Sequence, residues 1–288
     1  MLELDQQAKD AGVTILNEIG LDPGIDHLYA VSVIERLYQS GGKTKSFVSY
    51  CGGSTAPEDL MGAAKPYHIY PGFAFVAYPN RDSTPHRERY NIPEAEIIIR
   101  GTLRYQGFPE FISVLVDTGF LSDEEESFLK EPISWKEVTQ KMLGAASTDE
   151  TDLLKTISSK PILGILSDSK ITPNGNPLDT LCALLEQKMS YKQGERDFVL
   201  LQHKFEIENK DGTREVITST LSEYGAPFGS SGPGAMARLV GTPSVKLVLD
   251  GTIDSRGIIA PLSGNINRPL MQELREKCGI ECRERVIV

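Results

Sequence analysis

The stretch from Val13 to Leu37 constrains the fold more than any other part of the sequence. An apolar segment, Val13–Leu16, leads into a turn of glycine, aspartate and proline at residues 20–24, and an amphipathic segment, Ile25–Leu37, follows. A strand, a glycine-rich turn and a helix in this order are typical of the ligand-binding edge of an open α/β sheet. Because this unit lies so early in the sequence, we expect little preceding structure to pair with a strand at 13–19.

The rest of the sequence alternates helical and extended patterns, with a mainly helical middle. Asp211-Gly212 separates two alternating segments and predicts a β-hairpin. Ser122-Asp-Glu-Glu and Ser134-Trp-Lys-Glu fit the capping box that begins a helix. The sequence predicts helices at 2–11, 25–38, 108–118, 123–129, 135–143, 151–158, 177–188 and 269–277, and a further helix carrying Met236, Leu239 and Val240. It predicts strands at 43–50, 73–78, 97–99, 198–208, 215–223, 245–249 and 280–288. This pattern indicates an α/β (α+β) fold with a mixed sheet and an inserted all-α subdomain at 107–190.

The composition argues against several classes of partner. The net charge is −10, the pI is about 5.0, and no block of basic residues is present. We therefore expect no nucleic-acid or membrane partner. A membrane-spanning helix needs about 20 apolar residues, and no apolar segment of the sequence is nearly that long. Residues 1–15 also lack the apolar core of a signal peptide. The four cysteines show no metal-ligand spacing, so free thiols in a cytoplasmic protein are expected.

Two arginines follow apolar strands and are candidates for ligand binding. Arg81 and Arg104 each stand beside glycine, proline or small polar residues. An arginine at such a position can hold a carboxylate bidentately. The alternative is a surface ion pair, for example between Arg81 and Asp82. The pattern leaves both interpretations open.

The turn at 20–24 also has two interpretations. Asp22 and the N–H groups of the turn could contact a cofactor or substrate. Alternatively, Asp26 caps the following helix and Asp22 is a turn residue, which the pattern alone favours. His27, His68, His86 and His203 share no metal-ligand or triad spacing, so we predict no metal site and assign no catalytic residue. The glycine-rich segment 225–234 lacks the context of a dinucleotide motif and is predicted to be a loop.

Four longer motifs are similar to those of one enzyme family. They are Asn-Glu-Ile-Gly-Leu-Asp-Pro-Gly-Ile-Asp-His at 17–27, Ser-Tyr-Cys-Gly-Gly at 49–53, Tyr-Pro-Asn-Arg-Asp-Ser-Thr at 78–84 and Arg-Gly-Thr-Leu-Arg-Tyr at 100–105. Together they resemble saccharopine dehydrogenase (L-glutamate-forming), a family also called saccharopine reductase, in its fungal form. The resemblance covers essentially the whole sequence.

The resemblance implies a homodimeric, NADP(H)-linked oxidoreductase of lysine biosynthesis through aminoadipate. Glutamate and 2-aminoadipate 6-semialdehyde condense to an imine, which is reduced to saccharopine. By the family's domain plan, residues 1–24 are the remnant of a Rossmann domain. Residues 25–106 and 191–288 form the saccharopine-binding and dimerisation domain, and residues 107–190 the helical insert.

The resemblance also assigns residues to the two ligands. Leu21, Asp22 and Pro23 match positions that contact the cofactor, and Gly20 matches a position beside the substrate. Arg81, with Thr102, Leu103 and Arg104, matches the clamp for the substrate carboxylates. No residue is marked as a general acid, so water or the amine of the substrate serves in that role.

The sequence departs from the family pattern at three places. The first Rossmann strand and its Gly-x-Gly loop have no counterpart. Family members have a few dozen more residues between Gly53 and Glu58, including a Phe-Ser-Trp-Ser stretch, and a smaller segment is missing near 159–161. We therefore expect weak or no binding of NADP(H). The alternatives to an active enzyme are a non-catalytic dimerising or binding module and a truncated gene product.

Overall fold

A computed structural model describes residues 2–52, 64–80, 82–145, 147–148, 164–232, 234–235 and 242–287. The chain divides into two compact units. The first contains residues 1–54, 79–103 and 193–288, and the second contains residues 55–78 and 104–192. The helices predicted at 151–158 and around Met236 lie outside the described residues, as does Arg81.

The first unit is organised around a mixed sheet, as the sequence predicts. Its strands are β5 (Ile97–Tyr105, whose last two residues belong to the second unit), β2 (Lys43–Gly52), β6 (Phe198–Glu208), β7 (Arg214–Tyr224) and β9 (Arg283–Ile287), in that order. β2 is parallel to β5 and antiparallel to β6. The β6–β7 hairpin confirms the turn at Asp211-Gly212, where Gly212 has a φ of 85°.

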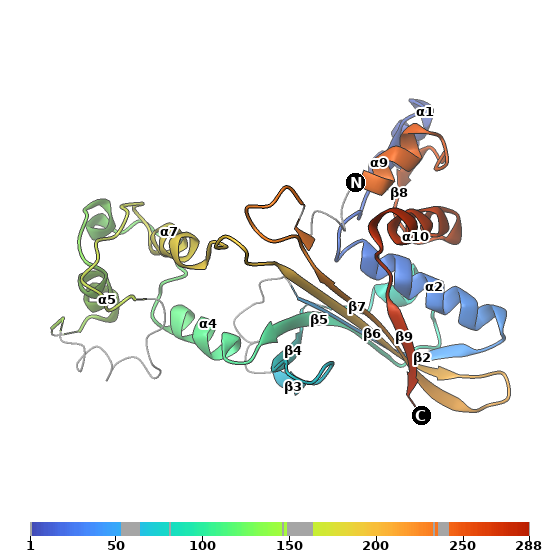
Figure 1. The fold of residues 1–288 in the computed structure, drawn as a ribbon, viewed down its shortest axis with the longest axis horizontal. Coiled ribbons are helices and arrows are strands. Elements are labelled where there is room, and N and C mark those ends of the chain that lie inside the picture. Colours follow the sequence, from blue (N-terminus) through green and yellow to red (C-terminus); the bar gives the residue numbers. More distant parts are fainter. Residues whose placement is uncertain are drawn as a thin grey trace. The chain divides into compact units, whose positions relative to one another are not determined.

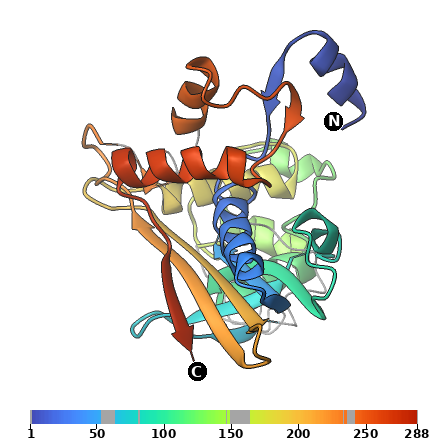
Figure 2. The same ribbon diagram turned by 90° about the vertical axis from the view of Figure 1, so that its right-hand side faces the viewer.

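One face of this sheet is covered by helix α2 (Ile25–Gln39), and helix α10 (Gly264–Cys278) packs beside α2 (Figures 1 and 2). Leu28 of α2 joins Leu201 and Leu221 of the sheet in one buried cluster. Helix α10 begins five residues before the predicted Pro269, which is therefore inside the helix. The carbonyl of Ser263 accepts the first helical N–H groups, so Pro269 falls in the second turn, where its missing N–H removes a single bond.

The strand predicted at 13–19 has a partner from far along the chain. β1 (Thr14–Leu16) is shorter than predicted and pairs in parallel with β8 (Gly257–Ile259). Sequence reasoning missed β8, which is only three residues long. This unit also contains the 3-10 helix η1 (Leu2–Leu4), α1 (Asp5–Asp10) and α9 (Thr242–Leu249), and the short α3 (His86–Arg89) follows β4. The strand predicted at 245–249 is wrong, because these residues belong to the helix α9. The side chain of Asp5 accepts a hydrogen bond from the N–H of Ile258 at 2.8 Å, which ties α1 to β8.

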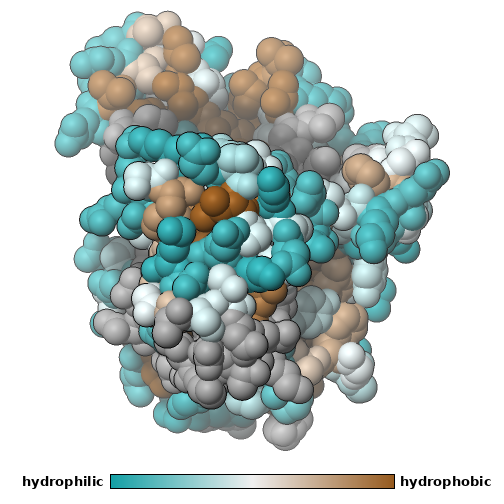
Figure 3. Space-filling view, turned by 90° about the vertical axis from the view of Figure 1, so that its left-hand side faces the viewer, coloured by the Kyte–Doolittle hydropathy of each residue, from teal (hydrophilic) through white to brown (hydrophobic). Residues whose placement is uncertain are grey.

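The second unit is mainly helical. It contains α4 (Phe108–Asp117), the 3-10 helix η3 (Ser127–Lys130), α5 (Trp135–Leu143) and α7 (Pro177–Met189), together with the antiparallel strands β3 (Lys65–Tyr67) and β4 (Phe75–Pro79). Its core is formed by the buried residues Leu115, Phe120, Leu129, Trp135, Val138, Ile165, Ile171, Leu181 and Leu184. In Figure 3 the part of the surface nearest the viewer that is coloured by hydropathy is mostly hydrophilic, with a small hydrophobic patch in it. None of the helices in the described part of the chain is long and apolar enough to cross a membrane.

The two predicted capping boxes of this unit have different outcomes. At α5 the box is confirmed, because the Ser134 hydroxyl accepts the N–H of Glu137 and the Glu137 carboxylate accepts the N–H of Ser134 at 2.8 Å. The prediction of a helix at 123–129 is wrong. The Ser122 hydroxyl instead accepts the N–H of Glu124 at 3.2 Å, which closes a tight turn, and only the 3-10 turn η3 follows.

Candidate functional site

The turn between β1 and α2 folds back on itself through its own backbone. The Gly20 N–H donates to the carbonyl of Pro23 at 3.0 Å, and the Ile25 N–H donates to the carbonyl of Gly20 at 2.9 Å. Gly24 has a φ of 150°, and a Cβ at this position would lie 2.0 Å from the Gly20 oxygen. Only glycine fits at position 24, so the shape of the Gly20–Gly24 turn strictly requires glycine there.

The side chain of Arg100 from β5 joins this turn to the start of α2. One terminal nitrogen, Nη2, donates to the carboxylates of both Asp22 and Asp26. The other, Nη1, lies 2.6 Å from Nε2 of His86. His86 Nδ1 lies 3.3 Å from the carbonyl of Ser83 and can donate its hydrogen there, which leaves Nε2 free to accept from Arg100. The guanidinium therefore uses three of its N–H groups in a single cluster.

Burial gives this cluster unusual electrostatics. The Asp26 side chain is fully buried, and burial raises the pKa of Asp26 while the charge of Arg100 opposes that rise. Asp26 also accepts the N–H of Gly24 at 2.6 Å. Although burial works to lower the pKa of Arg100, the carboxylates of Asp26 and Asp22 contribute to a net rise above its ordinary value. The guanidinium consequently stays charged where it holds the turn.

Two histidines beside Arg100 are kept neutral. His27 Nδ1 lies 2.7 Å from the hydroxyl of Tyr90, and its Nε2 lies 3.2 Å from the carboxylate of Glu18. Burial, together with the charge of Arg100, lowers the pKa of His27 to about 2. The same two causes lower the pKa of His203 to about 3. Neither ring carries a proton to donate as an imidazolium near neutral pH.

The residues predicted to contact the cofactor fall within this one turn. Leu21 is buried, Asp22 and Pro23 are exposed, and Gly20 is half-buried. The prediction that Asp26 caps α2 is wrong, because Gly24 is the N-cap and has no side-chain cap bond; Asp26 lies in the first turn and accepts the N–H of Gly24.

Three of the residues predicted to clamp the substrate, Thr102, Leu103 and Arg104, lie in the second half of β5. The side chains of Thr102 and Leu103 are buried, so either residue would reach a ligand through its main chain. Arg104 belongs to the second unit, and its guanidinium carbon lies 5.1 Å from the ring centroid of Phe108. The prediction for Arg81 concerns a residue outside the described part.

Sequence reasoning missed the central role of Arg100 and its partner His86. One signal was present, because Arg100 directly follows Ile97-Ile-Ile99 on a single strand. A charged side chain next to such an apolar segment needs an acidic partner once it is buried. Asp22 and Asp26 were the candidates, but their proximity depends on the tertiary fold.

The turn fits only part of NADP(H). Asp22 and Pro23 offer an exposed surface for contact with a cofactor. The N–H groups of Gly20, Gly24, Ile25 and Asp26 already donate within the chain, so they are not available to a pyrophosphate. Within the described ranges, no cluster of three or more histidine, cysteine or acidic side chains could hold a metal ion.

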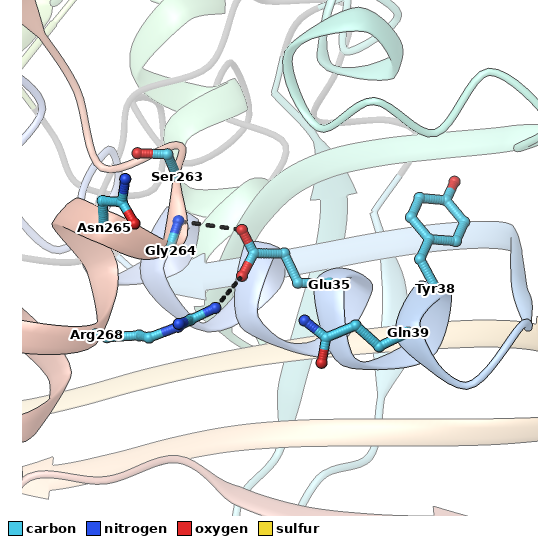
Figure 4. A pocket seen from close by; sticks show the side chains of 7 residues that line it. All are labelled: Glu35, Tyr38, Gln39, Ser263, Gly264, Asn265 and Arg268. Atoms are coloured by element: carbon cyan, nitrogen blue, oxygen red, sulfur yellow. Dashed lines mark hydrogen bonds and ion pairs between the residues drawn. The ribbon is translucent and has the colours of Figure 1, made fainter.

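Two hollows lie beside α2. One, of about 380 Å³, lies between α2 and the start of α10 (Figure 4). There the Glu35 carboxylate accepts the N–H of Gly264 at 3.0 Å and lies 3.9 Å from Arg268. Glu35 thus occupies the positive end of α10 and joins the two helices. The other, of about 20 Å³, includes Gly20 and Leu28 in its apolar lining and is too small for a ligand with several carboxylates.

A mixed sheet with a mainly helical second unit defines this chain as an α/β protein, and a buried arginine holds the glycine turn at the start of its first long helix. The chain belongs to the saccharopine dehydrogenase family, because the saccharopine dehydrogenase C-terminal domain matches residues 20–59 and 54–280. The predicted resemblance and the fold class are confirmed.

Several relatives cover nearly the whole chain. It is 57% identical to saccharopine dehydrogenase (NADP+, L-glutamate-forming) of Pyricularia oryzae, over 100% of this chain and 77% of the relative. It is 31% identical to the mitochondrial alpha-aminoadipic semialdehyde synthase of Bos taurus, over 95% of this chain and 35% of that protein. The solved apo structure of histidine-tagged saccharopine dehydrogenase (L-Glu forming) from Saccharomyces cerevisiae has a TM-score of 0.90 and 47% identity, over 99% of this chain and 77% of the other.

The match to the Pyricularia protein extends over 345 residues, whereas this chain has 288. The relative therefore has residues within the matched stretch that have no counterpart here. The two family matches overlap at residues 54–59, next to the place where family members are expected to have additional residues.

Proposed function

We propose that the chain is an NADP(H)-dependent saccharopine dehydrogenase of the L-glutamate-forming type, acting in lysine biosynthesis through aminoadipate. It would reduce the imine of glutamate and 2-aminoadipate 6-semialdehyde to saccharopine. The observation that carries this proposal is the 57% identity, across the whole chain, to a relative of that name.

Saccharopine carries three carboxylates, and a protein with a net charge of −10 needs local arginines to hold them. In the proposed site, Arg81 and Arg104 bind carboxylates, and Thr102 and Leu103 contribute their main chain because their side chains are buried. Gly20 lies beside the substrate. A Cβ there would approach the Pro23 oxygen to 2.9 Å, so this position also favours glycine.

NADP(H), when bound, exchanges a hydride with the substrate, and Leu21, Asp22 and Pro23 would contact it. The Arg100 guanidinium donates a hydrogen bond to the carboxylate of the exposed Asp22 and so orients it. Because His27 and His203 are neutral and buried, neither supplies a proton by ionising near neutral pH. Because no residue is marked as a general acid by the resemblance, we assign proton delivery to water or to the substrate amine.

We further propose a cytoplasmic homodimer, as the resemblance to the family implies. Sedimentation velocity of the purified chain gives its mass, and we expect about twice the 31.7 kDa of the single chain. A monomer at every concentration tested would contradict the dimer without bearing on the reaction.

The proposed reaction is tested by adding saccharopine and NADP+ to the purified chain and following the appearance of NADPH. Because weak binding of NADP(H) is expected, turnover should need a high concentration of NADP+, and Arg104→Lys should raise the KM for saccharopine by about tenfold, because lysine loses the bidentate fork. Arg214→Lys is the matched control, since Arg214 is an exposed residue at the start of β7. Absence of turnover together with absence of saccharopine binding would contradict the proposal.

A second candidate is a non-catalytic dimerising or binding module. The observation that favours it is the internal use of the N–H groups at 20, 24, 25 and 26. Titration of the chain with NADPH, followed by fluorescence, separates the two candidates. Weak or no binding, with co-purification of a full-length homologue, supports the module. Sub-micromolar binding supports the enzyme.

A further inference from the structure

We infer that the Arg100 side chain is a positioning residue that holds the Gly20–Gly24 turn in its ligand-binding shape. This inference rests on the proposed function for the identity of the ligands. The hydrogen bonds that carry it stand independently of that function.

The first support is the way in which Arg100 reaches both ends of the turn. Its Nη2 atom bonds to Asp22, within the turn, and to Asp26, in the first turn of α2. Asp26 in turn accepts the N–H of Gly24 at 2.6 Å. A single guanidinium therefore fixes the exposed tip of the turn directly and its base through one intermediate side chain.

The second support is the rigidity of Arg100 itself. Its backbone N–H donates to the Ser83 hydroxyl at 2.8 Å, and its carbonyl accepts the N–H of Asn80 at 3.1 Å. Its Nη1 atom is held by His86 at 2.6 Å. A side chain fixed to a strand at its root and to a helix at its tip can hold a flexible glycine turn.

The third support is that the two roles of Arg100 are separable. Its main chain holds residues 80 and 83, which flank the predicted clamp residue at 81, whereas its side chain holds the turn at 20–24. A side-chain substitution keeps the main-chain bonds. Its effect should therefore fall on the turn and on the ligand that the turn contacts.

The test compares Arg100→Lys with Arg36→Lys. Lysine keeps the positive charge beside Asp26, so the fold is retained, but it cannot bridge two carboxylates and a histidine as the planar fork does. Arg36 lies on α2 and forms an ion pair with Glu284 of β9, away from the turn, so it is the matched control. We expect peptides that cover residues 18–28 to exchange amide hydrogen about tenfold faster in Arg100→Lys, with the rest of the chain unchanged. Arg36→Lys should leave those peptides unchanged.

Ligand binding gives the functional readout. In Arg100→Lys we expect the KM for NADPH to rise about tenfold with a smaller change in kcat, because the contact surface is displaced and not removed. A merely structural role would lower the amount of folded enzyme and leave the KM unchanged.

Two results would overturn the inference. One is unchanged exchange at residues 18–28 in Arg100→Lys. The other is an equal acceleration across the whole chain, which would show that Arg100 supports only global stability. Hydrogen exchange needs neither ligand nor turnover, so the inference is tested even if the wild-type chain proves inactive. That inactivity would count against the proposed reaction alone.

Discussion

At the scale of single residues, the Gly20–Gly24 turn is fixed by a close backbone approach. A Cβ on Gly24 would lie within 2.5 Å of three backbone atoms of Gly20, and the φ of 150° is itself unfavourable for other residues. None of these three contacts can be relieved by rotating a side chain. The turn therefore depends on glycine more strictly than a left-handed helix end does.

We predict that Gly24→Ala lowers the free energy of unfolding by at least about 2 kcal/mol, because backbone strain and a steric clash add together. Gly12→Ala is the control, since Gly12 has a φ of 68° but no atom within 4 Å of the added Cβ. It should cost about 1 kcal/mol, from strain alone. Urea unfolding followed by circular dichroism measures both, and equal losses would contradict the role of the clash.

The sequence predicts part of this site because some of its members are neighbours in the chain. Asp22, Asp26 and His27 form a visible polar cluster at a strand-to-helix turn. Arg100 lies 74 residues after Asp26, and it reaches the turn only because β5 pairs with β2 in a particular register, with Arg100 opposite Ser49. A single sequence does not specify that register, so the partner of the acidic cluster could not be predicted.

At the scale of elements, local signals succeed where the interaction they describe is itself local. The capping box of α5 closes within four residues, and the structure contains it as predicted. The similar signal at Ser122 instead forms a tight turn, because the residues after it do not continue as a helix. The partner of β1 was missed because β8 lies some 240 residues away and has only three residues to show a pattern.

We predict that Ser134→Ala destabilises the helical unit by about 1 kcal/mol, because the N–H of Glu137 loses its acceptor. Trp135, the only tryptophan of the chain, is buried at the first position of α5, so its fluorescence reports on this unit. Ser122→Ala is the matched control and should cost less, because it removes a bond within a turn and not a helix cap. A larger loss from Ser122→Ala would contradict the assignment of the cap.

At the scale of the whole molecule, the fold gathers three of the four histidines of the chain around Arg100. His86 contacts the guanidinium directly, and the charge of Arg100 helps to lower the pKa of both His27 and His203. These residues come from α3, α2 and β6, so their environment is a product of the complete first unit. Its unfolding should therefore depend on pH.

The sign of this dependence follows from the direction of the shifts. The pKa of His203 is lowered from 6.5 to about 3 in the folded state, so below pH 6.5 the unfolded chain binds a proton that the folded chain does not. Stability from this residue is present above pH 6.5 and is lost as the pH falls toward 3, by about 1.4 kcal/mol per pH unit. His27 acts in the same direction, while the raised pKa of Asp26 acts in the opposite one.

We predict that His203→Gln removes the contribution of one histidine to this pH dependence. Between pH 6.5 and about pH 5, the free energy of unfolding of the variant should therefore fall by about 2 kcal/mol less than that of the wild type. Because His27 and Asp26 are present in both proteins, their contributions cancel in this comparison. Urea unfolding followed by circular dichroism at the two pH values measures it, with the exposed His68→Gln as control. Equal slopes in the wild type and His203→Gln would mean that His203 takes up its proton in the folded protein, contrary to its burial beside Arg100.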